Sequence, residues 1–287
     1  MSSSVQPISL ADHKPHGLSD WRSVYDFVLA IYRADSLLFQ LGSALVLLAL
    51  ISTALLLAYP APVSNLSVWI KPIKFDISFG TYAWTVAWWI SLLRNEGDPR
   101  ILLRRSFFFT IAIEVACISL QAGRTAIAGR SVRTPLDSAI GVLSTTMIFF
   151  NTLLVIWIAF VFWREAYGLS SIYSWANRLG LLIFLFGNAI GGQMLAHHGH
   201  TIGAPNNSAG LPFLNWSTIG GDLRISHFLS IHAIQVLPLA AFLLTRVRPH
   251  WPERKQRLAI FVTASAFSAF VLLTYLEAIL GIPFLRP

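Results

Sequence analysis

Long apolar runs alternate with short polar segments along this chain of 287 residues. Seven of the runs approach the length of about 20 apolar residues that a transmembrane helix needs. We expect spans at Leu37–Tyr59, Phe75–Leu93, Ser106–Gln121, Ile140–Trp163, Leu179–Leu195, Ile225–Thr245 and Leu258–Leu280. The pattern predicts an all-α integral membrane protein, in which residues 37–287 form a single bundle of seven transmembrane helices.

A further helical pattern precedes the first span. Between residues 21 and 33 the apolar positions fall at Trp21, Val24, Tyr25, Val28, Leu29 and Tyr32. This stripe predicts an amphipathic helix that lies on the membrane interface, or one that packs against the inner end of the bundle. Residues 1–20 are polar and contain prolines, so we expect a disordered tail and no cleavable signal peptide.

Two local features concern helix packing. Gly187 and Gly191 form a GxxxG pair in the fifth span, a spacing that favours close contact between helices. Pro238 stands inside the sixth span, where its missing N–H group predicts a kink.

Composition supports a membrane protein. Charged residues make up 12% of the chain and hydrophobic residues 55%, whereas a soluble domain carries about 25% charged residues. The net charge of +8 indicates basic cytoplasmic loops rather than nucleic-acid binding. Cys117 is the single cysteine, which excludes an internal disulfide and a thiolate metal cage.

The loop charges predict the orientation. With the N-terminus inside, 14 Lys and Arg residues fall in inner segments and 7 in outer segments. Inner loops of membrane proteins are enriched in these residues, so we expect a cytoplasmic N-terminus and an outer C-terminus. The short loops and plain N-terminus favour a bacterial inner membrane.

The longest outer connection covers residues 197–223, between the fifth and sixth spans. Its glycines, prolines and asparagines indicate a loop. Leu211, Phe213, Leu214 and Trp216 are nevertheless too apolar for a solvated connection. We expect this segment to fold back over the outer mouth of the bundle as a lid, because long ordered loops are often functional.

Five histidines bracket this loop: His197, His198, His200, His227 and His232. Imidazole is a ligand for zinc, copper and iron, and haem b would take one histidine from each of two facing helices. His197 or His198 with His227 or His232 fits that topology. His227 and His232 are five residues apart and point in different directions on a helix, so they cannot jointly bind one ion. The alternative is that the histidines form structural hydrogen bonds between helices.

Ionisable residues inside the spans are the other candidates, because they are costly in lipid and often functional. Glu114 is expected near the middle of the third span, with Gln121 on nearly the same face and Arg124 beyond it. Lys74 and Asp76 enter the second span, where a local or cross-helix ion pair would explain both. The predicted substrate contacts are Lys74, Asp76, Gln121, Arg124, Arg224 and Gln235.

These residues favour two function classes. The first is a metal- or haem-dependent membrane enzyme, an oxidoreductase or a hydrolase, with Glu114, Asp222 and His232 as catalytic residues and a small-molecule or lipid substrate that arrives from the outer side. The second is a proton-coupled transporter of a small polar or anionic solute, in which His232 is the titrating switch and the buried charges are Glu114, Asp76, Glu277, Lys74 and Arg124. A third function class is a receptor or scaffold in which the polar networks are only structural. The HExxH, GxSxG and phosphate-loop motifs are absent from the sequence.

Overall fold

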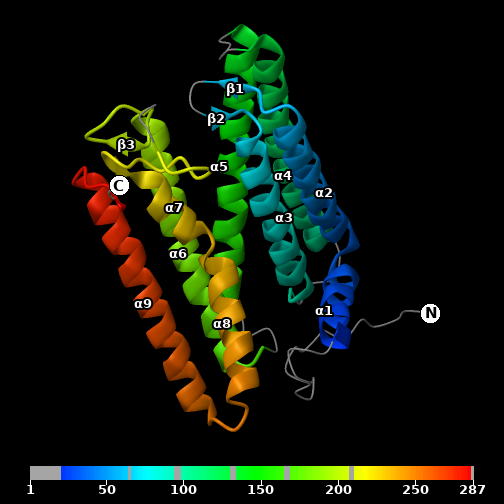
Figure 1. Cartoon of the computed structure of the whole chain (residues 1–287). Helices are drawn as coiled ribbons and strands as arrows, with labels where there is room; N and C mark the ends of the chain where they lie inside the picture. Colours follow the sequence, from blue (N-terminus) through cyan, green and yellow to red (C-terminus); the bar gives the residue numbers. More distant parts are fainter. Residues whose placement is uncertain are drawn as a thin grey trace. The chain divides into compact units, whose positions relative to one another are not determined.

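The computed structural model is all-helical apart from two small hairpins (Figure 1). It describes residues 21–63, 66–93, 98–129, 134–164, 169–206 and 210–285. The chain divides into two compact units between Leu154 and Val155, inside one long helix. The predicted disordered tail, residues 1–20, lies outside the described residues.

The first unit contains five helices and one hairpin in its described part. Their bounds are α1 Trp21–Ala34, α2 Ser36–Ala58, β1 Pro62–Val63, β2 Leu66–Ser67, α3 Ile70–Ser91, α4 Asp98–Ala128 and the first two thirds of α5 Pro135–Arg164. The helix predicted over residues 21–33 is therefore present as α1, and its place at a membrane interface stays a prediction.

The second unit contains the end of α5 and the remaining elements. These are α6 Ser171–Ala196, β3 Thr201–Ile202, β4 Gly221–Asp222, α7 Leu223–Ile231, α8 Ala233–Val247 and α9 Glu253–Ile279. Its core gathers apolar side chains of α6, α8 and α9, among them Ile172, Leu237 and Ile260.

Four described helices are long and apolar enough to cross a membrane: α2, α5, α6 and α9. The pair α7 and α8 qualifies as a fifth span that bends by 47°. These helices confirm the prediction of a multi-pass membrane protein. The second and third predicted spans are helical too, as α3 and α4, but α3 carries Lys71, Lys74 and Asp76 in its first two turns. The count of seven spans and the single bundle stay predictions.

Small residues bring α2 and α3 close together in the first unit. A Cβ atom on Gly80 would lie 3.1 Å from the carbonyl oxygen of Gly42. The two helices are joined by an antiparallel hairpin in which Pro62 pairs with Ser67. Asp35 caps α2, since its carboxylate accepts a hydrogen bond from the N–H of Leu38 at 3.0 Å. This tight pair holds the polar residues at the start of α3 in place.

The Gly187–Gly191 pair of α6 allows a close contact with another helix, as its spacing predicts. A Cβ atom on Gly187 would lie 2.6 Å from the Cβ atom of Ser230, and one on Gly191 would lie 3.0 Å from the His227 ring. Both partners belong to α7. Only a residue without a side chain permits this approach, so the prediction of close helix contact is confirmed.

The bend in the sixth predicted span is not at Pro238. It lies at His232, between α7 and α8, and Pro238 follows inside α8. At the bend, the carbonyl oxygen of Ala233 would be 3.0 Å from a Cβ atom on Gly180 of α6. The break between α7 and α8 therefore coincides with a contact to α6. The position of Pro238 in the sequence does not predict this contact.

Candidate functional site

Asp76 is a completely buried carboxylic acid on α3. Its exposed fraction is 0%, and neither carboxylate oxygen has a hydrogen-bond partner among the described residues. The expected local ion pair with Lys74 is wrong, because residues two apart on a helix point to opposite sides and the described residues form no such pair. A buried acid without a partner is rare in proteins and needs a reason.

Glu114 lies on α4 and is also buried, with 3% of its surface exposed. Its Oε1 atom accepts a hydrogen bond from the Ser144 hydroxyl of α5 at 2.9 Å, whereas Oε2 is buried without a partner in the described part of the chain. The burial expected from the sequence is thus confirmed, and one acceptor remains available.

A second polar layer in the same unit joins three helices. The Tyr82 hydroxyl of α3 donates to Oδ1 of Asn151 at 2.7 Å, and Nδ2 of Asn151 donates to the Thr110 hydroxyl at 3.0 Å. Sequence reasoning missed both Ser144 and Asn151 of α5. Each is a polar residue within an otherwise apolar run, and that interruption is the signal that could have found them.

Arg124 has a local structural partner. Its Nε atom donates to Oδ1 of Asp137 at 2.9 Å, which ties the end of α4 to the start of α5. Thr134 donates both its N–H group and its hydroxyl to the same carboxylate. Gln121 is half-buried one turn before Arg124. The substrate contacts expected for Gln121 and Arg124 stay predictions.

The lid residues of the second unit are organised by one buried ion pair. Asp222 is 1% exposed and accepts hydrogen bonds from the N–H groups of Ser217 and Arg224 at 2.8 and 3.0 Å. The Arg224 guanidinium binds both carboxylate oxygens, at 2.9 Å from Nε to Oδ1 and 2.6 Å from Nη2 to Oδ2. It also donates to the carbonyl of Asn215. The acceptor sites of Asp222 are therefore occupied by the loop itself.

This ion pair fixes the lid on the end of the second unit. Strand β4 begins at Gly221, and a Cβ atom there would lie 2.1 Å from the carbonyl oxygen of Ala278 on α9. The Trp216 ring contacts the rings of Phe228 and Phe284. Trp216 of the loop thus packs onto α7 and the segment after α9, in keeping with the expected fold-back, whereas Phe213 is exposed.

The histidines that precede the lid diverge. His197 and His198 are exposed where α6 ends, and His198 has a left-handed backbone with φ of 49°. Nδ1 of His200 lies 2.9 Å from the Thr201 hydroxyl and 3.9 Å from Oδ1 of Asp222. Burial, and then the positive charge of Arg224, lower the pKa of His200, although Asp222 acts in the opposite direction.

The two histidines of the sixth predicted span form contacts within the helices. Nδ1 of His227 lies 2.7 Å from the carbonyl oxygen of Gly187 on α6. His232 stands at the break between α7 and α8, where its ring packs 4.6 Å from the Phe228 ring and hydrogen-bonds Gln235. His227 thus makes the structural hydrogen bond that the sequence left as the alternative to a ligand.

No group of three His, Cys, Asp or Glu residues in the described part of the chain could hold a metal ion. A metal centre built from His197, His198, His200, His227 and His232 is therefore not supported. The roles of the individual histidines as cofactor ligands, including haem ligands, stay predictions.

Comparison with known proteins gives no family for the chain: no family model, no curated protein and no solved structure matches it.

Proposed function

We propose that this chain is a multi-pass membrane protein that binds protons at Asp76 and Glu114 and couples this binding to the passage of a small polar or anionic solute. The observation that carries the proposal is the complete burial of Asp76 without a hydrogen-bond partner among the described residues. An unpaired carboxylate in apolar surroundings is expensive unless it is protonated. Ionisable groups in such positions mark proton relays in pumps and transporters.

Glu114 supports the same proposal because only one of its two carboxylate oxygens has a hydrogen-bond partner in the described part of the chain. The Ser144 hydroxyl donates to one oxygen, Oε1, whereas Oε2 is buried without a partner among the described residues. One carboxylate oxygen of Glu114 is therefore compensated by a hydrogen bond, whereas neither oxygen of Asp76 accepts one among the described residues. Two buried acids with unequal compensation can hold protons of unequal affinity, as a relay requires.

The cations at the start of α3 support an anionic or polar solute. Lys71 is exposed, and its ammonium lies 5.6 Å from the centre of the Phe75 ring. Lys74 follows within one turn. Together they place positive charge at the entry to the helix that carries Asp76, where an anion would be attracted.

The proposal includes the orientation of the protein in the membrane. The excess of Lys and Arg in alternate loops supports a cytoplasmic N-terminus, an outer C-terminus and a bacterial inner membrane. In this arrangement the start of α3 and the lid loop face the outer side. A metal-dependent enzyme has no comparable support, since no three metal-binding side chains meet among the described residues.

An apolar carbodiimide tests the proton site directly, because this reagent enters lipid and reacts with protonated carboxyl groups. The purified full-length chain in lipid vesicles is treated between pH 5 and pH 9, and modified residues are located by peptide mass spectrometry. We expect modification of Asp76 that declines as the pH rises. Asp76→Asn removes the modified peptide, and Glu114→Gln removes the second one.

Glu253→Gln serves as the matched control, because Glu253 is an exposed acid at the start of α9. It should leave the modification of Asp76 unchanged. The same vesicles, loaded with a pH-sensitive dye, report proton entry under an imposed pH gradient, which Asp76→Asn should abolish. Absence of carbodiimide reaction at every pH, or proton entry that persists in Asp76→Asn, contradicts the proposal.

A further inference from the structure

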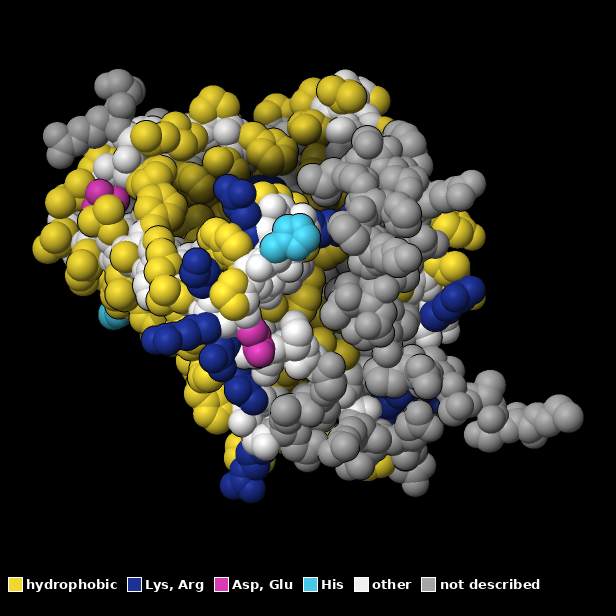
Figure 2. Space-filling model, turned by 90° about the horizontal axis from the view of Figure 1, so that it is seen from below, with side chains coloured by type: hydrophobic (Ala, Val, Ile, Leu, Met, Phe, Trp, Pro, Cys, Tyr) yellow, Lys and Arg dark blue, Asp and Glu magenta, His cyan; other side chains and the backbone are white. Residues whose placement is uncertain are grey.

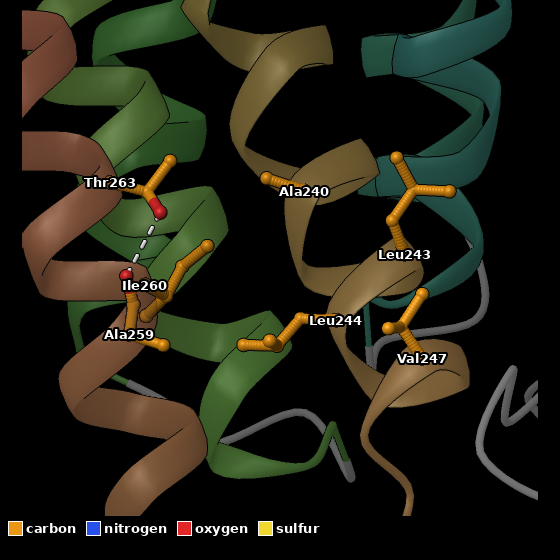
Figure 3. Close-up of a pocket in the computed structure, with 7 residues that line it drawn as sticks. All are labelled: Ala240, Leu243, Leu244, Val247, Ala259, Ile260 and Thr263. Carbon is orange, nitrogen blue, oxygen red and sulfur yellow. Dashed lines mark hydrogen bonds between the residues drawn. The ribbon is translucent and has the colours of Figure 1, made fainter.

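A shallow apolar groove runs between α8 and α9 of the second unit (Figure 3). Its volume is about 360 Å³, and it is lined by Ala240, Leu243, Leu244, Val247, Ala259, Ile260 and Thr263. The one hydroxyl in this lining is satisfied internally, since Thr263 donates to the carbonyl of Ala259 at 2.9 Å. The groove therefore offers an apolar ligand no polar partner along its length.

Positive charge borders one end of the groove. Val247 is the last residue of α8, and Arg246 and Arg248 stand on either side of it in the sequence. On α9 the residues that precede the lining positions include Arg254, Lys255 and Arg257. Glu253 is the one acid between residues 246 and 257. Figure 2, which views this end of the molecule from below, shows many Lys and Arg side chains and few acids.

In the parts of the chain that the structure describes, Arg248, Arg254, Lys255 and Arg257 form no salt bridge with a carboxylate. Two guanidinium groups rest against rings: that of Arg246 lies 4.6 Å from the Phe242 ring centre and that of Arg248 lies 5.8 Å from the Trp251 ring centre. The ring contact of Arg248 leaves the N–H donors of its guanidinium available to an anion.

We infer that this groove is a binding site for an anionic glycerophospholipid. One acyl chain lies along the apolar lining, and the phosphate accepts hydrogen bonds from the arginines at the end of the groove. The charge fits an anionic headgroup, because basic pockets at the ends of transmembrane helices bind such lipids. The volume fits one chain, since small-molecule sites begin at about 300 Å³. This inference does not rest on the proposed proton coupling.

The experiment compares phosphatidylglycerol with phosphatidylcholine of the same acyl chains. The full-length protein is purified in detergent, incubated with each lipid, and lipid retained on the protein is measured by native mass spectrometry. We expect retention of phosphatidylglycerol well above that of phosphatidylcholine. The double variant Arg254→Gln/Arg257→Gln should weaken phosphatidylglycerol binding by about tenfold or more, because each cation contributes to attraction of an anionic lipid.

The acyl-chain half of the site has its own variant. Ala259→Phe fills the groove without changing charge, and it should reduce phosphatidylglycerol binding although every arginine remains. The matched charge control is Arg33→Gln/Arg105→Gln, which removes two exposed cations of the first unit and should leave binding unchanged. Thermal unfolding of each variant checks that it is folded, and Arg248→Gln replaces the double variant if that protein is not.

Three outcomes overturn the inference. The first is equal retention of the two lipids by the wild type. The second is an equal loss of phosphatidylglycerol in the control variant, which would indicate net charge rather than a site. The third is full displacement of the lipid by inorganic phosphate together with normal binding in Ala259→Phe, which would indicate an anion site without an acyl chain.

Discussion

The ring of His227 on α7 is held by the backbone of Gly187 on α6, with 2.7 Å between Nδ1 and the carbonyl oxygen. The contact is possible because the same helix face carries glycine at 187 and again at 191, where the His227 ring takes the space of a side chain. A carbonyl oxygen can only accept, so Nδ1 of His227 carries a proton and donates. The histidine and the GxxxG pair therefore form one packing unit.

Enlargement of Gly187 should disrupt this packing. In Gly187→Ala the new methyl group would lie 2.6 Å from the Cβ atom of Ser230, so α6 and α7 must separate. We expect a loss of about 1–3 kcal/mol in the free energy of unfolding, the usual cost of overpacking. Thermal or denaturant unfolding in detergent, followed by tryptophan fluorescence, measures it.

Gly192→Ala is the matched control, because a Cβ atom at that position meets no atom within 4 Å. It should be neutral or slightly stabilising, since alanine has the higher helix propensity. Equal destabilisation by both substitutions would mean that the contact between α6 and α7 is not the reason why position 187 needs glycine.

If His227 has only a structural role, its removal should lower stability and leave the content of bound metal or haem unchanged. We expect His227→Ala to lower stability by about 0.6 kcal/mol through loss of its hydrogen bond, the average for membrane proteins, with a further loss from the space left behind. His197→Ala should be silent, because His197 is exposed. Visible spectra and metal analysis of both purified variants provide the test. A Soret band or bound metal that disappears in both would restore the ligand hypothesis.

Arg224→Lys tests the ion pair under the lid. Lysine keeps the charge but cannot contact both oxygens of Asp222 and the carbonyl of Asn215 together. Disruption of a largely buried pair costs about 3–5 kcal/mol, and partial exposure of Arg224 reduces this to about 1–3 kcal/mol. Hydrogen exchange of residues 211–222 should accelerate in this variant. Arg178→Lys is the control in the same unit, and exchange in the lid should be unaffected by it.

The lid should also respond to pH through His200. The pKa of His200 is lowered from 6.5 in the folded protein, mainly by burial, so folding favours the neutral ring. The contribution of the neutral ring to stability is therefore fully present above pH 6.5 and is lost as the pH falls through the lowered pKa. Acidification should therefore speed exchange at the Leu223 N–H group, which bonds the carbonyl of His200 at 2.9 Å.

His200→Gln separates this effect from the intrinsic pH dependence of exchange. After correction for that dependence, opening of the lid should be independent of pH between 5 and 7 in the variant. The other charges that face His200 are Asp222 and Arg224. A pH response that persists in His200→Gln would assign it to another group.

The sequence predicts burial and helix contact well where lipid and packing set the constraints. Each of the seven expected spans is helical over most of its length, although Tyr59, Leu92, Leu93 and Leu280 fall beyond helix ends and His232 interrupts the sixth span. Glu114 is buried on a helix, and the Gly187–Gly191 pair makes the close contact that its spacing predicts. Polar partners are less predictable because they depend on helix rotation. The Lys74–Asp76 pair fails for this reason, and Ser144 and Asn151 could be recognised as partners only once α4 and α5 were placed side by side.

Two other features depend on tertiary contacts that no local pattern contains. The bend at His232 coincides with the approach of Ala233 to Gly180, whereas the local signal pointed to Pro238. The histidine cluster is contiguous in sequence but diverges in space, because α6 ends at Ala196 and the chain turns at His198. Nearness along a chain does not give a common centre when a helix end intervenes.

The orientation of the second unit can be measured with two introduced cysteines. Within this unit the lid and the α8–α9 connection lie at opposite ends of the helices (Figure 1), so a membrane crossed by these helices would separate them. Ile219 of the lid and His250 of the connection are both exposed. The native Cys117 is buried, and Cys117→Ser removes any remaining labelling of the native cysteine.

In the Cys117→Ser protein, Ile219→Cys should react with an impermeant maleimide added outside intact cells. His250→Cys should react only after the cells are opened, because Lys and Arg in its loop favour the cytoplasmic side. Reaction of both cysteines from the same side would exclude a membrane between the two ends, and reversed sides would show that the loop charges do not set the orientation.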